Sequence, residues 1–168
     1  MTLAELNTLP GYRAVDELVN CCGSRAWARI LARRRPFVSL ERLVQAASEV
    51  WLRLDAADWM EAFQAHPQIG QRQPAAHASV QAQAWSAREQ SGMSRAGVGA
   101  TMDLEAANQE YLSKFGYIFI VCASGKRAGE MLAILRSRLS NTPEAEIHVA
   151  AEEQDKITRL RLERLITG

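Results

Sequence analysis

Cysteine is scarce in this sequence, and long apolar runs are absent. The chain has three cysteines in 168 residues, and two of them, Cys21 and Cys22, are adjacent. This number and spacing provide neither a disulfide framework nor a CxxC metal site, so we expect a reduced, cytoplasmic protein. The longest apolar run, from Tyr117 to Ala123, is far too short to cross a bilayer, and no membrane partner is predicted.

The sequence also has no excess of charge of one sign and no metal-binding motif. It contains 20 basic and 19 acidic residues, which gives no reason to expect nucleic acid or a membrane surface as a partner. An HExxH motif, paired histidines and carboxylate clusters are all missing, so we predict no metal. With 48% apolar and 23% charged residues, the composition is that of an ordinary globular chain, and its length favours one domain over residues 1–168.

What the sequence does have is helical periodicity along most of its length. Capping residues such as Thr2 and Ser39 precede apolar positions spaced three and four apart, and Thr142 is followed by proline at the first helical position. We therefore predict an all-α fold, a single-domain bundle of about eight helices, with loops over 68–78 and 91–99. The longer helices are expected at Ser39–Leu54, Ser79–Gln90, from Asp103 through Tyr111, Lys126–Leu139 and Thr142–Ile166.

One short segment near 116–123 has the residue types of an extended strand instead. Between Phe115 and Cys122 the chain is rich in aromatic and β-branched side chains, yet no second strand is predicted to pair with it. If the segment is buried and extended, its backbone N–H and C=O groups need partners, and a polar ligand would be one. A buried helical or irregular core segment explains the same residues equally well.

An arginine occupies the centre of the apolar stripe of the last helix. At about 100° per residue, the other side chains of the stripe project within roughly 40° of Arg161, and charged positions fall on the opposite side. Because an unpaired buried charge is very costly, something anionic should lie next to this guanidinium. The pattern allows two partners, a carboxylate of the protein or one that belongs to a substrate. The stripe around Arg161 consists of Ile147, Ala150, Gln154, Ile157 and Leu165.

Two further positions are candidates for acid–base chemistry. His66 precedes Pro67 where a helix ends, and such a histidine either takes part in catalysis or interacts with the helix dipole. Glu89 and Ser86 share one face of a helix with Trp85, whose apolar ring could tune the carboxyl group as an acid or base. A solvated glutamate is the alternative interpretation.

Four short motifs, taken in order along the chain, carry a family resemblance. They are His66-Pro67-Gln68-Ile69-Gly70, Ser86-Ala87-Arg88-Glu89-Gln90, Lys114-Phe115-Gly116-Tyr117-Ile118-Phe119, and Lys156-Ile157 followed by Arg161-Leu162. The set resembles the 2-oxo-4-hydroxy-4-carboxy-5-ureidoimidazoline (OHCU) decarboxylase family, which produces (S)-allantoin in urate breakdown. The resemblance covers nearly the whole chain, and the four motifs in this order and spacing are specific.

The resemblance implies an all-helical lyase that converts the small molecule OHCU to (S)-allantoin and CO2, needs no cofactor and is usually a homodimer. The family's catalytic histidine, glutamate and arginine carry over onto His66, Glu89 and Arg161. Whether the histidine or the glutamate delivers the final proton stays open. The substrate-binding residues carry over onto Pro67, Ser86 and Gln90, and onto Phe119, Ile120, Val121, Cys122 and Ala123, the last five largely through backbone groups.

The chain departs from the family pattern at two places. Tyr117 and Ile118 replace the second Phe and the Pro of the usual Phe-Gly-Phe-Pro-Phe, which restores a backbone N–H. Gln68 replaces the usual aspartate after His-Pro. Two alternatives to the decarboxylase stay open: a non-catalytic helical interaction module in which Arg161 pairs with an internal carboxylate such as Glu89, and a lyase or hydrolase for a related small ureido acid.

Overall fold

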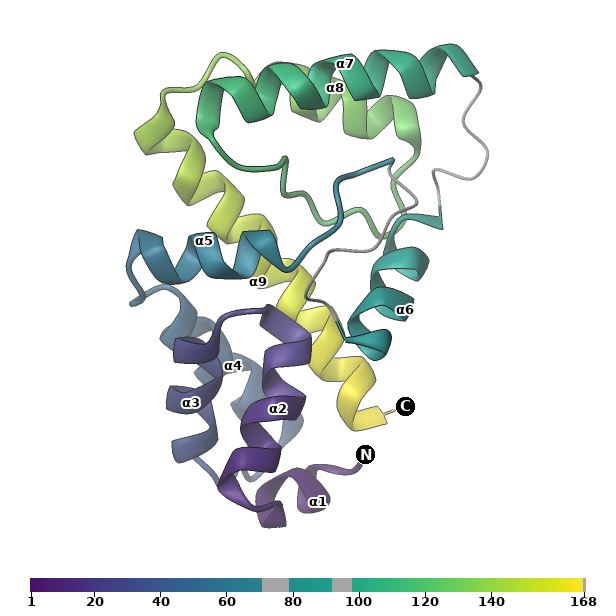
Figure 1. Cartoon of the computed structure of the whole chain (residues 1–168). Helices are drawn as coiled ribbons and strands as arrows, with labels where there is room; N and C mark the ends of the chain where they lie inside the picture. Colours follow the sequence, from purple (N-terminus) through teal and green to yellow (C-terminus); the bar gives the residue numbers. More distant parts are fainter. Residues whose placement is uncertain (71–78, 92–97, 168) are drawn as a thin grey trace. The chain divides into compact units, whose positions relative to one another are not determined.

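The chain folds into helices joined by loops (Figure 1). The computed structural model describes residues 1–70, 79–91 and 98–167, and within these ranges it has nine α-helices and no strand, which confirms the predicted all-α fold. None of these helices is both long enough and apolar enough to span a membrane. Their bounds are α1 Leu3–Thr8, α2 Gly11–Cys22, α3 Arg25–Arg33, α4 Leu40–Trp51, α5 Ala56–Gln64, α6 Val80–Glu89, α7 Val98–Phe115, α8 Ala128–Arg138 and α9 Pro143–Thr167.

Side-chain caps begin several of these helices where the sequence places them. Thr2 and Glu5 form a reciprocal capping box at α1, in which the Glu5 N–H donates to Thr2 Oγ1 at 3.2 Å. The hydroxyl groups of Ser39 and Ser79 accept hydrogen bonds from the first turns of α4 and α6. Each cap satisfies a backbone N–H that has no partner inside its helix, so the local sequence sets these starting points.

The end of α4 differs from the prediction. The helix ends at Trp51 and not at Leu54, because the N–H of Leu54 turns to the carbonyl oxygen of Trp51 at 3.2 Å. Asp55 then caps the next helix, since its Oδ1 accepts from the N–H of Asp58 at 3.1 Å. The periodic apolar positions therefore continue through a turn, and periodicity alone does not separate the two helices.

The predicted starts of α7 and α8 were also wrong by a few residues. The first begins at Val98 and not at Asp103, because the helix continues N-terminally past the aspartate expected to start it. The second begins at Ala128 and not at Lys126, after Arg127 at its N-cap. The loops predicted over 68–78 and 91–99 fall mostly on residues 71–78 and 92–97, which lie outside the described residues.

The chain divides into two compact units. The first comprises Met1–Ala62 and Asp155–Gly168, and the second comprises Phe63–Gln154. Helices α5 and α9 each contribute residues to both units. Each unit has buried side chains of its own.

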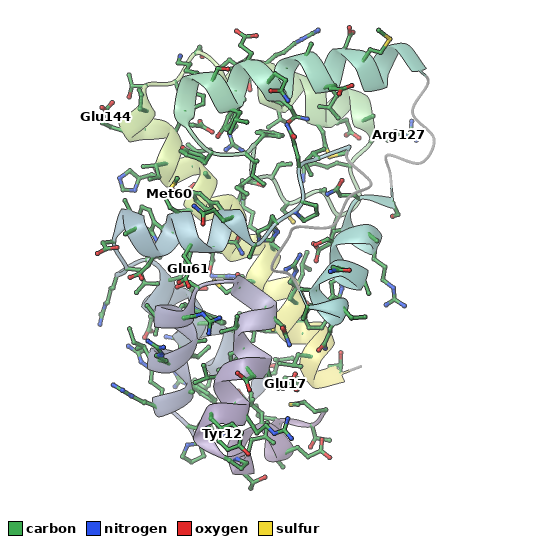
Figure 2. The ribbon with its side chains drawn as sticks, viewed as in Figure 1. Tyr12, Glu17, Met60, Glu61, Arg127 and Glu144 are labelled. Carbon is green, nitrogen blue, oxygen red and sulfur yellow. The ribbon has the colours of Figure 1, made fainter. Side chains whose placement is uncertain are left out.

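The core of the first unit is built from α1 to α5 and the C-terminal half of α9. Trp27 Nε1 donates to the carbonyl oxygen of Ala47 at 2.9 Å, and Trp59 Nε1 donates to that of Trp51 at 3.0 Å. These two bonds satisfy the polar atoms of large buried rings. Tyr12, by contrast, projects from α2 into solvent (Figure 2). The largest buried side chains of this unit are Leu6, Leu18, Trp27, Leu31, Leu43 and Trp51.

Aromatic rings form much of the core of the second unit. The ring of Tyr111 on α7 lies 4.6 Å from that of Phe115, 5.9 Å from that of Tyr117 and 5.4 Å from that of Phe119, measured between centroids. The last two residues belong to the chain between α7 and α8, so this cluster packs that segment against α7. Polar side chains such as Glu144, on the first turn of α9, lie on the outside (Figure 2).

A buried ion pair joins three helices of the second unit. Arg138 at the end of α8 donates from Nε to Glu146 Oε1 on α9 at 2.6 Å, and the same carboxylate accepts from the hydroxyl of Tyr111 on α7. Asn141 Nδ2 donates to the other carboxylate oxygen at 2.7 Å. The guanidinium also lies over the Phe119 ring, 4.7 Å from its centroid. Both charges are thus paired and hydrogen-bonded, as burial requires.

Candidate active site

The His-Pro motif forms a corner directly after α5. The N–H of His66 donates to the carbonyl oxygen of Phe63 at 3.2 Å and closes the last turn before Pro67. Two residues further on, the carbonyl oxygen of Ile69 accepts from Asn108 Nδ2 on α7 at 2.9 Å. The N–H of Gly70 donates to Gln90 Oε1 at 3.1 Å. The loop that carries His66 is therefore fixed to α7 and to the end of α6.

Helix α6 presents its functional side chains on a buried face. Ser86 is 5% exposed and Glu89 is 7% exposed, on the same side as Trp85. The interpretation of Glu89 as a solvated glutamate is therefore wrong, whereas Arg88 on the other side is exposed. Glutamate is seldom fully buried unless it is paired or has a chemical role, so Glu89 is a candidate for such a role.

The segment Phe119–Ala123 is buried and lies outside helices and strands, as the irregular-core alternative stated. All five residues are less than one-tenth exposed. Charged side chains satisfy part of the backbone: the carbonyl oxygen of Ile120 accepts from Arg138 Nη1 at 2.7 Å, and the N–H of Cys122 donates to Glu153 Oε2 at 2.7 Å. The segment is thus held by its main chain, without a pairing strand.

Two residues of this segment, Phe119 and Val121, have no backbone hydrogen bond among the described residues. Val121 itself is 3% exposed. Buried backbone groups nearly always have a partner in a protein, in water or in a ligand. The backbone of Val121 is therefore a candidate for contact with a bound molecule.

The charge of a residue on α6, Glu89, affects the pKa of Cys122 in this segment. Burial raises the pKa of the Cys122 thiol above its usual range, the Lys126 ammonium opposes this effect, and the negative charges of Glu153 and Glu89 add to it. The negative charge of Glu89 thus contributes to the electrostatic environment of Cys122. The second unit therefore contains the His66 corner, the buried face of α6 and the segment Phe119–Ala123.

Arg161 belongs to the first unit. It is 3% exposed, as the periodicity of α9 predicts, whereas Glu152, Lys156 and Glu163 on the other side of the helix are exposed. Within its unit it lies near Cys22, whose pKa is raised to about 12 by burial, while the positive charge of Arg161 acts in the opposite direction. The stripe prediction is confirmed, and Arg161 is a buried guanidinium.

Several residues around this part of the second unit have no role that the sequence predicts. Asn108, Lys126, Arg138 and Glu153 all bind the backbone of predicted site segments. Glu153 lies about 80° around α9 from Arg161, at the edge of the buried stripe, and this position is the one signal that could have selected it. Among the described residues no three His, Cys, Asp or Glu side chains gather as a metal site would require.

Known proteins similar to this chain act in uric acid breakdown. A uric acid degradation bifunctional protein of Arabidopsis thaliana is 37% identical over 153 residues, which cover 90% of this chain and 47% of that protein. An OHCU decarboxylase of Halalkalicoccus jeotgali is 26% identical over 166 residues, which cover 98% of this chain and 92% of that protein. The chain thus spans about half of the first relative and nearly all of the second.

Two solved structures are also similar to this chain. A crystal structure of OHCU decarboxylase in the presence of (S)-allantoin has a TM-score of 0.79 and 36% sequence identity, covering 91% of this chain and 99% of that one. A crystal structure of (S)-allantoin synthase, 20% identical, shares the fold with a TM-score of 0.75, over 99% of this chain and 54% of the other. Fold and relatives together define a carbon–carbon lyase of urate degradation. The chain belongs to the OHCU decarboxylase family, whose sequence model matches residues 7–163.

Proposed function

We propose that this chain converts OHCU to (S)-allantoin and CO2 without a cofactor, as a homodimer in the cytoplasm, with residues 1–168 acting as one domain. The observation that carries the proposal is the burial of the Glu89 carboxylate beside Ser86, in the unit that also holds the His66 corner and the backbone of Val121, which has no hydrogen bond within the described residues. Family membership supplies the reaction class.

The substrate itself explains why no cofactor is needed. In OHCU the carboxylate is attached to a ring carbon that also carries the hydroxyl group, next to a C=N bond. When the bond to the carboxylate breaks, CO2 leaves, the electron pair forms a double bond to the neighbouring carbon, and the imine nitrogen takes up a proton. Protonation of that carbon and loss of the hydroxyl proton give the carbonyl group of allantoin. The protein has to orient the carboxylate and deliver a proton to one face.

His66 acts in this proposal as the general acid–base group near the substrate hydroxyl. The hydrogen bonds from Asn108 to Ile69 and from Gly70 to Gln90 support the assignment, because they hold the corner on both sides. A catalytic group must be placed to within a fraction of an ångström, and a loop fixed to two helices meets that need better than a free one.

Glu89 binds the ring or ureido N–H groups and helps to steer the proton, with Ser86 and Gln90 beside it on α6. Pro67 and the backbone of Phe119–Ala123 line the substrate-binding site. Val121 supports this role, because its buried N–H and C=O have no hydrogen bond within the described residues. Arg161 binds a carboxylate or carbonyl oxygen through a forked pair of hydrogen bonds, the geometry in which a guanidinium is most effective.

The test uses purified protein supplied with freshly generated urate-oxidation products. OHCU decays spontaneously to racemic allantoin, so the handedness of the product is more informative than its amount. Circular dichroism should show optically active (S)-allantoin forming in proportion to the protein concentration. A product that stays racemic at every protein concentration would contradict the proposed activity.

A further inference from the structure

Cys122 is held between two side chains of opposite charge. Its N–H donates to Glu153 Oε2 at 2.7 Å, and its carbonyl oxygen accepts from Lys126 Nζ at 2.7 Å. Glu153 comes from the part of α9 that belongs to the second unit. Lys126 lies just before α8 and precedes Arg127, which Figure 2 labels. Hydrogen bonds to ionised groups are shorter and about twice as strong as neutral ones. Two of them therefore fix the main chain at one residue.

The planarity of the peptide bond extends this effect to both neighbours. In a trans peptide the C=O and N–H groups of one plane point in opposite directions. Because Glu153 binds the N–H of Cys122, the carbonyl group of Val121 points away from Glu153. Because Lys126 binds the carbonyl oxygen of Cys122, the N–H of Ala123 points away from Lys126.

A third side chain acts in the same way one residue earlier. Arg138 Nη1 donates to the carbonyl oxygen of Ile120 at 2.7 Å, so the N–H of Val121 points away from that guanidinium. Three consecutive peptide planes are thus each held from one side by a charged side chain. The opposite ends of the three planes are the Val121 N–H, the Val121 C=O and the Ala123 N–H, which form a donor, an acceptor and a donor in sequence.

These three groups have no hydrogen bond among the described residues, although Val121 and Ala123 are both 3% exposed. The Oγ of the next residue, Ser124, is likewise buried without a hydrogen-bond partner in the described part of the chain. Four neighbouring buried polar groups without partners among the described residues are suited to contact a polar ligand. The alternation of donor and acceptor suits a ureido or cyclic amide group, whose C=O and N–H groups lie side by side.

We propose that Glu153 and Lys126 are positioning residues, which orient the Val121 and Ala123 peptides as a donor–acceptor–donor edge for the ureido-imidazoline ligand. The inference rests on the proposed function, since that function supplies the ligand class. Neither side chain touches the substrate in this account. Both act through the two peptide planes that flank Cys122.

The test compares substitutions of Glu153 that differ only in the ability to accept a hydrogen bond. Glu153→Gln keeps a side-chain carbonyl oxygen for the Cys122 N–H, and Glu153→Leu removes the acceptor at similar size. We expect Glu153→Leu to raise the KM for OHCU about tenfold or more, the effect of losing one hydrogen bond to a charged group, and Glu153→Gln to stay within about threefold of the parent. Glu152→Leu, on the adjacent exposed position of α9, is the matched control and should leave KM unchanged.

A second variant makes the test independent of how Glu153→Leu folds. Lys126→Met removes the donor to the Cys122 carbonyl oxygen, and it should also raise KM about tenfold and weaken (S)-allantoin binding by calorimetry to a similar degree. A merely structural role would lower the melting temperature and the active fraction, leave KM unchanged and show no rescue by glutamine, and that result would overturn the inference. Failure of the proposed function is distinct, because the parent protein would then form no optically active allantoin.

Discussion

Asn108 Nδ2 donates a hydrogen bond to the carbonyl oxygen of Ile69, 2.9 Å away, and so joins α7 to the loop that carries His66. The asparagine is 2% exposed and comes from the middle of a helix, 39 residues from its partner in sequence. This one bond connects the most regular part of the second unit to its proposed catalytic corner.

Removal of this bond should reduce both stability and activity. In Asn108→Ala the buried carbonyl group of Ile69 loses its donor, which costs about 1–3 kcal/mol of unfolding free energy. Because the loop then moves more freely, kcat should fall about tenfold or more. Urea unfolding and the circular dichroism assay measure the two effects. Gln109→Ala, at the exposed neighbouring position, serves as the control, and equal effects in both variants would contradict the role given to Asn108.

The Arg138–Glu146 pair should dominate the stability of the second unit. Glu146→Leu leaves the guanidinium buried without its carboxylate, and we expect a loss of about 3–5 kcal/mol in unfolding free energy. The double variant Arg138→Met, Glu146→Leu removes both charges and should recover a large part of that loss. Chemical denaturation of the two variants and the parent measures this. A double variant less stable than Glu146→Leu would show that the pair is not the source of the loss.

The stability of the protein should decrease at high pH because of Cys22. Burial raises the pKa of this thiol from 9.0 to about 12, so the unfolded chain loses the thiol proton at lower pH than the folded chain does. Stability from this group is complete below pH 9 and is lost between pH 9 and 12, at no more than about 1.4 kcal/mol per pH unit. Cys22→Ala should show a shallower decline of unfolding free energy between pH 9 and 10.5. Parallel curves for parent and variant would contradict this assignment.

Substitution of Arg161 should reduce catalytic activity more than it reduces stability. Arg161→Lys keeps a positive charge but replaces a planar fork with a point charge, so kcat/KM for OHCU should fall about tenfold or more. Steady-state kinetics measure this fall, and the melting temperature reports the stability of the same samples. Full activity in Arg161→Lys would show that the forked contact is not used.

The features that sequence could predict are those that repeat with the helical period. The burial of Arg161 and the exposure of Glu163 follow from the stripe on α9, and the caps at Thr2 and Ser39 follow from local side-chain chemistry. The burial of Glu89 could not be predicted in the same way. The alanines and glutamines of α6 make the faces of this helix similar in hydropathy.

The hydrogen bonds that Glu153 and Lys126 make to the backbone of Cys122 could not be predicted from the sequence, for a different reason. The chain from Gly116 to Arg127 has no regular period, and the partners of its backbone come from α8, α9 and Lys126. Such contacts depend on the path of an irregular segment through a folded core. A pattern in the sequence describes periodic structure, and this segment has none.

The central claim is that the chain forms (S)-allantoin from OHCU and uses His66 to do so. The most direct measurement is the enantiomeric excess and the rate of allantoin formation from fresh OHCU, by circular dichroism, for the parent protein and for His66→Ala. We expect optically active (S)-allantoin from the parent and a rate lower by about 100-fold or more in the variant. Racemic product from the parent at the spontaneous rate, or near-normal turnover by His66→Ala, would contradict it.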